Sequence, residues 1–269
     1  MAELLRFDRV EISYDEYPAV RDVNMTLHEG EILAVVGESG SGKSTLIRAA
    51  MGLLGTSGKV VGGDIRYRGK SLLNLPEEER RRINGPEIGM IFQDSGSFFC
   101  PVRTIGSQLY ESMTSHRAVT KKDFENTASD LLRKLGFEDG RRILKSYPFE
   151  LSGGMQQRAG IAAAMLLKPS VLLADEPTSA LDVFSQKQVV EEMLLLRRMF
   201  GTSIILVTHN IGVAGAMADN VLVLKDGRAA EYGETQKVFS APQNAYTKKL
   251  MAAVPRLRLS GSHHDMEYT

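Results

Sequence analysis

Residues 37–44 combine glycines, hydroxyls and one lysine at a spacing that could bind phosphate groups. The segment reads Gly37-Glu38-Ser39-Gly40-Ser41-Gly42-Lys43-Ser44 and matches the pattern G-x-x-x-x-G-K-[ST]. Glycines let the backbone curl so that successive N–H groups point inward at an anion, and the positive end of a following helix adds to the attraction. Lys43 would reach the β- and γ-phosphates of a nucleotide, and the Ser44 hydroxyl would bind Mg²⁺. A structural turn is the alternative, but the match lies between a strand-like and a helix-like segment.

Two carboxylates at the end of an apolar run form a second candidate site. Val171–Ala174 predicts a buried strand, and Asp175 and Glu176 follow at its end, where open α/β sheets bind ligands. Asp175 would hold Mg²⁺, and Glu176 would polarise the water that attacks the γ-phosphorus. Alone this pattern is weak, since many buried strands end in acidic residues.

The segments that must position these residues alternate between strand and helix patterns. Alternation or apolar runs predict strands at residues 4–14, 24–30, 32–37, 171–175, 203–209 and 220–227. Turn glycines around Asp64–Arg68 predict a small antiparallel piece. Residues 101–167 have a helical pattern, with a helix that starts at a Thr120–Asp123 capping box, and a further helix is predicted at residues 184–200. The order predicts an α/β fold interrupted by a helical insertion.

The composition limits the class of protein. With 269 residues, 43% of them hydrophobic, the chain can bury the core of one large domain or of a domain with a subdomain. Thirty-three basic and 33 acidic side chains cancel, so we expect no nucleic acid partner. The single cysteine, Cys100, excludes an intramolecular disulfide. The longest apolar stretch, at 159–167, is shorter than the about 20 residues that cross a bilayer, and the start does not resemble a signal peptide, so we expect a cytoplasmic protein.

With a third motif, the sequence resembles a known protein family. Leu151-Ser152-Gly153-Gly154-Met155-Gln156-Gln157-Arg158, just before an apolar helix, resembles the signature motif of ATP-binding cassette (ABC) proteins. Further positions resemble other family elements in the same order along the chain: Tyr14 the adenine-stacking aromatic, Gln93 the Q-loop glutamine, Ser179-Ala180-Leu181-Asp182 the D-loop, and His209 the switch histidine. Tyr14 could equally pack, and Tyr17 lies only three residues away.

The resemblance implies a P-loop NTPase fold of the ABC type, with a RecA-like core, an antiparallel β-subdomain and an inserted helical subdomain. The ATPase domain would span residues 1–240, with the helical subdomain at about 95–167, and residues 241–269 would form a C-terminal extension and tail. ATP and Mg²⁺ would be the cofactors. The implied catalytic residues are Lys43, Gln93, Glu176 and His209; the metal contacts are Ser44, Gln93 and Asp175; and the nucleotide contacts are Tyr14, Gly37, Glu38, Ser39, Gly40, Ser41, Gly42, Lys43, Ser44, Thr45, Ser152, Gly153, Gly154 and Asp182.

The signature motif is a second anion site in its own right. Ser152 would cap a helix whose first amides, at Gly153 and Gly154, allow close approach of an anion. Two such sites in one chain need two phosphates or two chains. In the family, two subunits pack head to tail, so that each ATP lies between the phosphate-binding loop of one and the signature motif of the other.

Two further segments resemble the branch of the family that imports peptides or nickel. They are the run from Asp175 to Val183 and the tail segment Asn244–Leu250, whereas Asp94-Ser95 and Cys100-Pro101 depart from the pattern of that branch. The implied partners are two transmembrane permease subunits, an extracytoplasmic solute-binding protein, and either a second copy or a related ATPase subunit. The chain would then be peripheral on the cytoplasmic face of the cell membrane.

Several alternatives remain open at this stage. The chain could be the ABC-type ATPase of a soluble complex, such as a phosphonate-degrading assembly, a small-molecule kinase, or a binding module in which Glu176 is idle. Phe98 and Phe99 lie in a polar loop, where they would form an interface or pack into the core. His263 and His264 in the tail are expected to be solvated.

Overall fold

The computed structural model describes residues 2–93, 98–179 and 181–253. The strands are β1 (Glu3–Tyr14), β2 (Tyr17–His28), β3 (Ile32–Val36), β4 (Gly58–Tyr67), β5 (Lys70–Ser71), β6 (Ile88–Ile91), β7 (Val171–Asp175), β8 (Ser203–Thr208), β9 (Asn220–Lys225) and β10 (Arg228–Glu234). The helices are α1 (Lys43–Met51), α2 (Glu77–Ile83), α4 (Ile105–Thr114), α5 (Lys121–Lys134), α6 (Gly140–Lys145), the 3₁₀ turn η1 (Pro148–Glu150), α7 (Gly153–Met165), α8 (Val183–Phe200), α9 (Ile211–Met217), α10 (Thr235–Ser240) and α11 (Ala245–Ala252).

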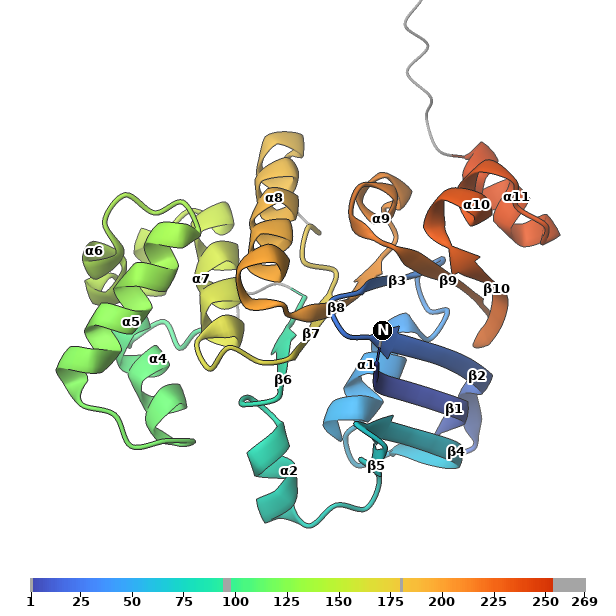
Figure 1. Cartoon of the computed structure of the whole chain (residues 1–269), viewed down its shortest axis with the longest axis horizontal. Helices are drawn as coiled ribbons and strands as arrows, with labels where there is room; N and C mark the ends of the chain where they lie inside the picture. Colours follow the sequence, from blue (N-terminus) through green and yellow to red (C-terminus); the bar gives the residue numbers. More distant parts are fainter. Residues whose placement is uncertain (1, 94–97, 180, 254–269) are drawn as a thin grey trace, which may run out of the picture.

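A sheet with the strand order β10-β9-β3-β8-β7-β6 forms the centre of the molecule (Figure 1). β3, β8, β7 and β6 are parallel neighbours. Every residue of β3, β7 and β8 is buried because other elements cover both faces of the sheet, which explains their continuous apolar sequences. The carboxyl ends of these four strands therefore lie along one edge.

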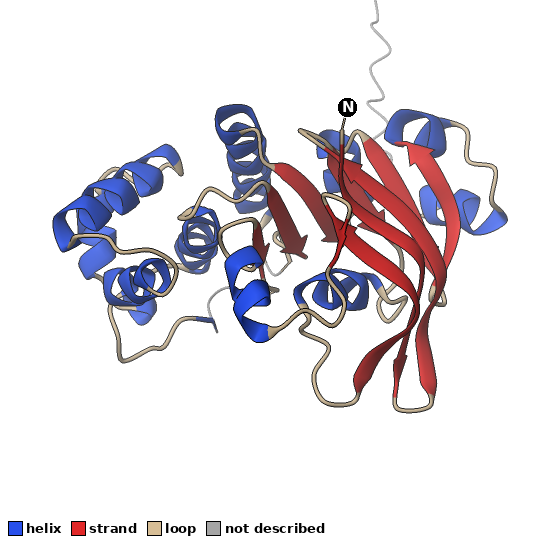
Figure 2. Cartoon of the chain, turned by 60° about the horizontal axis from the view of Figure 1, so that its bottom comes forward, coloured by secondary structure: helices blue, strands red, loops and turns tan. Residues whose placement is uncertain are grey.

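A second sheet, with the order β2-β1-β4-β5, is antiparallel and lies at the opposite end of the molecule from α4–α6 (Figures 1 and 2). Helix α1 packs between the two sheets, with Leu46 and Ile47 fully buried. The small antiparallel piece predicted near Asp64 belongs to β4, which starts earlier because it pairs along β1 as far as Gly58, opposite Tyr14.

The predicted helical insertion is confirmed between β6 and β7, where the chain forms α4, α5, α6, η1 and α7. The Thr120 hydroxyl accepts a hydrogen bond from the Asp123 amide and so caps α5, as the sequence predicts. Phe124, Leu131 and Leu132 of this helix are buried in a cluster that also includes residues of α7 and α8. The insertion is therefore packed onto the parallel sheet through α7 and α8.

The C-terminal part of the described chain adds helices that the sequence analysis does not predict. α10 and α11 lie beside β9 and β10 (Figure 1), and Tyr246 and Leu250 of α11 pack against a cluster that contains Val36 and Val223. Within residues 2–93, 98–179 and 181–253, no helix is long and apolar enough to cross a membrane. His263 and His264 lie outside the described residues, as do Asp94, Ser95 and Ala180.

The two adjacent phenylalanines have different environments. Phe98 is 57% exposed, whereas Phe99 is 4% exposed and belongs to the main core cluster. An interface role for both rings is therefore wrong for Phe99, because it packs with the inserted helices. Phe98 stacks on Phe92, with ring centroids 5.5 Å apart.

A buried carboxylate lies where the insertion meets α8. Glu192 of α8 is 3.8 Å from the guanidinium of Arg158 on α7, and neither of its oxygens has a hydrogen-bond partner. Arg158 in turn donates to the Leu135 and Gly136 carbonyls at the end of α5 and lies over the Phe137 ring. Burial raises the pKa of Glu192 from 4.5 to about 7, even though Arg158 lowers it.

We predict that Glu192 makes the stability of this protein fall as the pH rises. Between about pH 4.5 and 7 the folded chain keeps a proton that the unfolded chain releases, so this group favours folding below that range and disfavours it above. Glu192→Gln should raise the free energy of unfolding at about pH 8 by on the order of 1 kcal/mol and leave it unchanged near about pH 4, below the unfolded-state pKa. Denaturant titrations at several pH values measure this difference.

The control is Glu78→Gln, which removes an exposed carboxylate in the first turn of α2. It should leave the pH dependence unchanged. Parallel pH profiles for wild type and Glu192→Gln would contradict the prediction.

Candidate nucleotide-binding site

The loop at residues 37–42 joins β3 to α1, and backbone atoms of other segments pack tightly against two of its glycines. A Cβ on Gly37 would lie 2.1 Å from the Leu224 carbonyl oxygen, and one on Gly42, whose φ is 98°, would lie 2.8 Å from the Ala19 carbonyl oxygen. Both positions therefore require glycine. Of the remaining loop residues, Glu38, Ser39 and Gly40 are exposed, Ser41 is buried, and Ser44 and Thr45 are half-buried on the first turn of α1.

The predicted phosphate-binding lysine points back into this loop. Lys43 Nζ donates to the Gly37 carbonyl at 2.9 Å and to the Glu38 carbonyl at 2.8 Å. Burial lowers the pKa of Lys43, while the carboxylates of Glu176 and Asp175 oppose that decrease. The loop and the acidic end of β7 therefore belong to one site.

Asp175 is fully buried at the end of β7, and both of its oxygens have partners. Ser44 Oγ donates to Oδ1 at 2.5 Å, and Arg48 Nη2 lies 3.2 Å from Oδ2. Sequence analysis missed Arg48, although it lies four residues after Ser44 and so on the same face of α1. Hydroxyl, carboxylate and amide oxygens, here from Ser44, Asp175 and Gln93, are the ligands that Mg²⁺ prefers. This donor set fits the predicted ion.

Glu176 occupies a backbone conformation that is unusual for its residue type. Its φ is 47°, in the left-handed region. Its N–H donates to the Val207 carbonyl at 2.9 Å, and its carbonyl accepts from the amide and the hydroxyl of Ser179. These bonds hold a strained residue at the start of the loop that follows β7.

The side chains of three predicted catalytic residues meet at the Glu176 carboxylate. Its Oε1 lies 3.2 Å from His209 Nδ1, and its Oε2 accepts a hydrogen bond from Gln93 Nε2 at 3.3 Å. Gln93 follows β6, Glu176 follows β7 and His209 follows β8, so adjacent strands supply all three. The Glu176 side chain is 13% exposed and that of His209 58%, so the group opens to solvent.

Ser152 has the capping role that its motif predicts, and Asp182, which the sequence analysis gave only as part of the D-loop, caps a helix as well. Ser152 precedes α7 and accepts a hydrogen bond from the Met155 amide at 3.4 Å. Asp182 precedes α8, and hydrogen bonds from the Ser185 amide and hydroxyl lower its pKa. Ser152 and Gly153 are exposed and Gly154 half-buried, so the start of α7 is accessible to a ligand or to a second chain.

Tyr14 lies at the end of β1, and its ring packs against Gly58: a Cβ added at Gly58 would lie 2.8 Å from Tyr14 Cε1. The ring is half-buried, and Tyr17 beside it is 80% exposed. Among the described residues, Tyr14, Ser152 and Asp182 have no hydrogen bond or ion pair with Lys43, Asp175 or Glu176. Within the described part of one chain, the phosphate-binding loop therefore contacts Asp175 and lies near Glu176, but the signature motif contacts none of these residues through hydrogen bonds or ion pairs.

Comparisons with known proteins show the family of this chain. The sequence model of the ABC transporter family matches residues 20–179. The chain is 43% identical to the oligopeptide transport ATP-binding protein OppD of Salmonella typhimurium over 244 residues, covering 91% of this chain and 72% of that protein. It is 41% identical to the dipeptide transport ATP-binding protein DppD of Bacillus subtilis, covering 97% and 80%. It is 37% identical to CntD of Staphylococcus aureus, an ATP-binding protein of a metal-staphylopine import system, covering 94% and 95%.

Solved structures show the same fold. The dimeric ATP-binding cassette MJ0796, in a post-hydrolysis state with ADP and Pi, is 27% identical and superposes with a TM-score of 0.76, covering 86% of this chain and 99% of that chain. The structure of cbiO1 from Clostridium perfringens, part of the ABC transporter complex cbiONQ, is 25% identical with a TM-score of 0.79. It covers 90% of this chain and 92% of its own. The chain belongs to the ABC transporter family, and it is an ATP-binding subunit that hydrolyses ATP.

Proposed function

We propose that this protein is the ATP-hydrolysing subunit of a binding-protein-dependent importer of peptides or metal complexes. The convergence of Gln93, Glu176 and His209 beside the phosphate-binding loop carries the proposal. Similarity to OppD, DppD and CntD supports the cargo class. Residues 1–240 would form the ATPase domain, with the helical subdomain at about 95–167, and residues 241–269 the C-terminal extension and tail.

The reaction is attack of water on the γ-phosphorus of ATP. The bond between the γ-phosphorus and the β–γ bridging oxygen breaks, which releases ADP and phosphate. The Glu176 carboxylate would orient and polarise this water, and Gln93 and His209 hold that carboxylate from either side. His209 would also contact the γ-phosphate, and Lys43 would exchange its loop carbonyls for phosphate oxygens. Tyr14 would stack on the adenine.

Mg²⁺ fits beside the phosphates, where Ser44, Asp175 and Gln93 would hold it and it would neutralise charge on the β- and γ-phosphate oxygens. Asp175 is already oriented by Ser44 on one side and by Arg48 on the other.

A complete site would need a second ATPase chain. The exposed start of α7, with Ser152, Gly153 and Gly154, is a helix N-terminus suited to a γ-phosphate presented by the partner. Asp182, which caps α8, would lie at the same seam. The dimeric state of the cassette MJ0796 supports this arrangement. The partner is a second copy or a related ATPase subunit.

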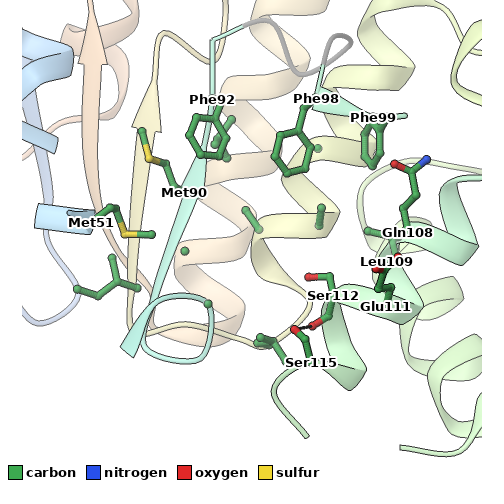
Figure 3. Close-up of a pocket in the computed structure, with 18 of the residues that line it drawn as sticks. Met51, Met90, Phe92, Phe98, Phe99, Gln108, Leu109, Glu111, Ser112 and Ser115 are labelled. Atoms are coloured by element: carbon green, nitrogen blue, oxygen red, sulfur yellow. Dashed lines mark hydrogen bonds between the residues drawn. The ribbon is translucent and has the colours of Figure 1, made fainter. Parts of the chain in front are cut away.

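A groove next to Gln93 is the proposed contact with the membrane subunits. It has a volume of about 490 Å³ and lies between β6, α4 and α7. Figure 3 shows the rings of Phe92, Phe98 and Phe99 side by side along one edge, with the polar side chains of Ser112 and Ser115 at the other. A short cytoplasmic helix of one of the two transmembrane permease subunits would dock here, and the protein would then lie on the cytoplasmic face of the membrane. An extracytoplasmic solute-binding protein would deliver the cargo.

We predict that Glu176→Gln separates binding from hydrolysis. Glutamine keeps the size of the side chain but cannot polarise water as a base, so turnover should fall by about 10²–10⁴ while ATP still binds. The variant should also form an ATP-dependent dimer. Phosphate release and light scattering measure the two effects. Glu191→Gln, an exposed change on α8, serves as the control, and wild-type turnover in Glu176→Gln would refute the role of Glu176.

We predict that Ser152→Arg abolishes turnover without weakening the binding of ATP to the single chain. The large cation would fill the start of α7, where the partner's γ-phosphate is expected. The matched control is Ser107→Arg, which places the same side chain at an exposed serine of α4 in the same group of helices. Retained ATPase activity in Ser152→Arg would show that α7 does not complete the site.

We predict that Phe98→Ala uncouples ATP hydrolysis from transport. Loss of the ring removes the exposed edge of the groove and its stack on Phe92, while the isolated ATPase should stay within about twofold of wild type. Val61→Ala on β4 is the control, because Val61 is 58% exposed against 57% for Phe98. Uptake assays in vesicles that contain the permease subunits provide the measurement. Normal uptake by Phe98→Ala would contradict the docking role.

A further inference from the structure

The phosphate-binding loop is held from outside by two segments near the C-terminal end of the described chain. The Gly227 amide, in the turn between β9 and β10, donates to the Ser41 carbonyl at 3.1 Å. The Glu38 amide donates to the hydroxyl oxygen of Tyr246, on α11, at 3.2 Å. Tyr246 lies beyond residues 20–179, the part of the chain that matches the family.

The Tyr246 hydroxyl is fixed in place by the packing of its own helix. The Asn244 side chain caps α11 by accepting from the Tyr246 amide at 2.8 Å, and its Nδ2 donates to the Ala230 carbonyl at 2.9 Å. The ring packs against the cluster that contains Val36, and Lys225 Nζ lies 5.0 Å from its centroid. A hydroxyl on so constrained a ring has little freedom to leave its partner.

A single residue, Glu38, links the hydrogen bond of Tyr246 to the nucleotide site. The N–H of Glu38 is bound by Tyr246, and the carbonyl of Glu38 accepts from Lys43 Nζ at 2.8 Å. Rotation of the backbone at Glu38 would therefore change the shape of the loop around the phosphate-binding lysine. Replacing the hydroxyl by hydrogen removes the protein acceptor of this amide and lets the loop sample other conformations.

We propose that Tyr246 is a positioning residue for the nucleotide, through which α11 holds the phosphate-binding loop in the conformation that receives the phosphates. The inference rests on the proposed ATPase function. It assigns the C-terminal extension a part in setting the affinity for ATP. Tyr246 acts through Glu38 and Lys43 and need not touch the nucleotide itself.

The test compares Tyr246→Phe with Tyr232→Phe in the full-length protein. Each substitution removes one phenolic hydroxyl: that of Tyr246 accepts from the loop, whereas that of Tyr232 donates to the Thr26 carbonyl at 3.1 Å, between β10 and β2. For Tyr246→Phe we expect the KM and the Kd for ATP with Mg²⁺ to rise about three- to tenfold. The kcat at saturation should stay within about twofold, since the catalytic group at Glu176 is unchanged. Tyr232→Phe should leave all three constants unchanged.

Thermal unfolding without nucleotide separates a positioning role from a structural one. Equal midpoints for the two variants, together with weaker ATP binding in Tyr246→Phe alone, would support the proposal. An unchanged Kd in Tyr246→Phe would overturn it, and so would a loss of affinity matched by a lower unfolding midpoint than that of Tyr232→Phe. A wild-type protein that neither binds nor hydrolyses ATP would instead defeat the proposed function.

Discussion

The parallel alignment of β3, β8, β7 and β6 is the constraint on which the candidate site depends. Each strand delivers one group to the same edge: the phosphate-binding loop, His209, the Asp175–Glu176 pair and Gln93. Asp175, the last residue of β7, contacts Ser44 and Arg48, whereas Glu176, whose left-handed backbone starts the following loop, contacts His209 and Gln93. A shift of β7 by one residue would move both carboxylates away from these partners and destroy both sets of contacts.

A protein without net charge can bind a polyanion only through a few charged groups whose positions are fixed by their neighbours. Asp175 is fully buried with hydrogen-bond partners on both oxygens, and Lys43 is buried with two carbonyl acceptors, so burial of each charge is compensated. Glu192 differs: neither of its oxygens has a hydrogen-bond partner, and burial raises its pKa. A buried charge with hydrogen-bond partners thus stays ready for the nucleotide at Asp175 and Lys43, whereas a buried carboxyl without them makes the contact between α7 and α8 sensitive to pH.

The sequence predicted the parts of this structure that depend on short-range signals. The phosphate-binding loop, the Ser152 cap of α7 and the Thr120 cap of α5 all follow from residue types at fixed spacings. It could not predict features that distant segments decide. The start of β4 at Gly58 depends on pairing with β1, and the burial of Phe99 depends on the inserted helices. The contact of Tyr246 with Glu38 joins residues more than 200 positions apart, which no local pattern encodes.

The strand order also constrains how the chain can be made. β3 is synthesised early, yet its two neighbours in the sheet, β8 and β9, come late: Ile32 pairs with Ile204 and Leu33 with Asn220. A nascent chain on the ribosome must therefore carry an apolar strand without its partners until most of the polypeptide has emerged. Such long-range pairing slows folding and leaves a strand edge open to other chains. The first strand of this sheet to be synthesised thus lies at its centre and is among the last to gain both of its partners.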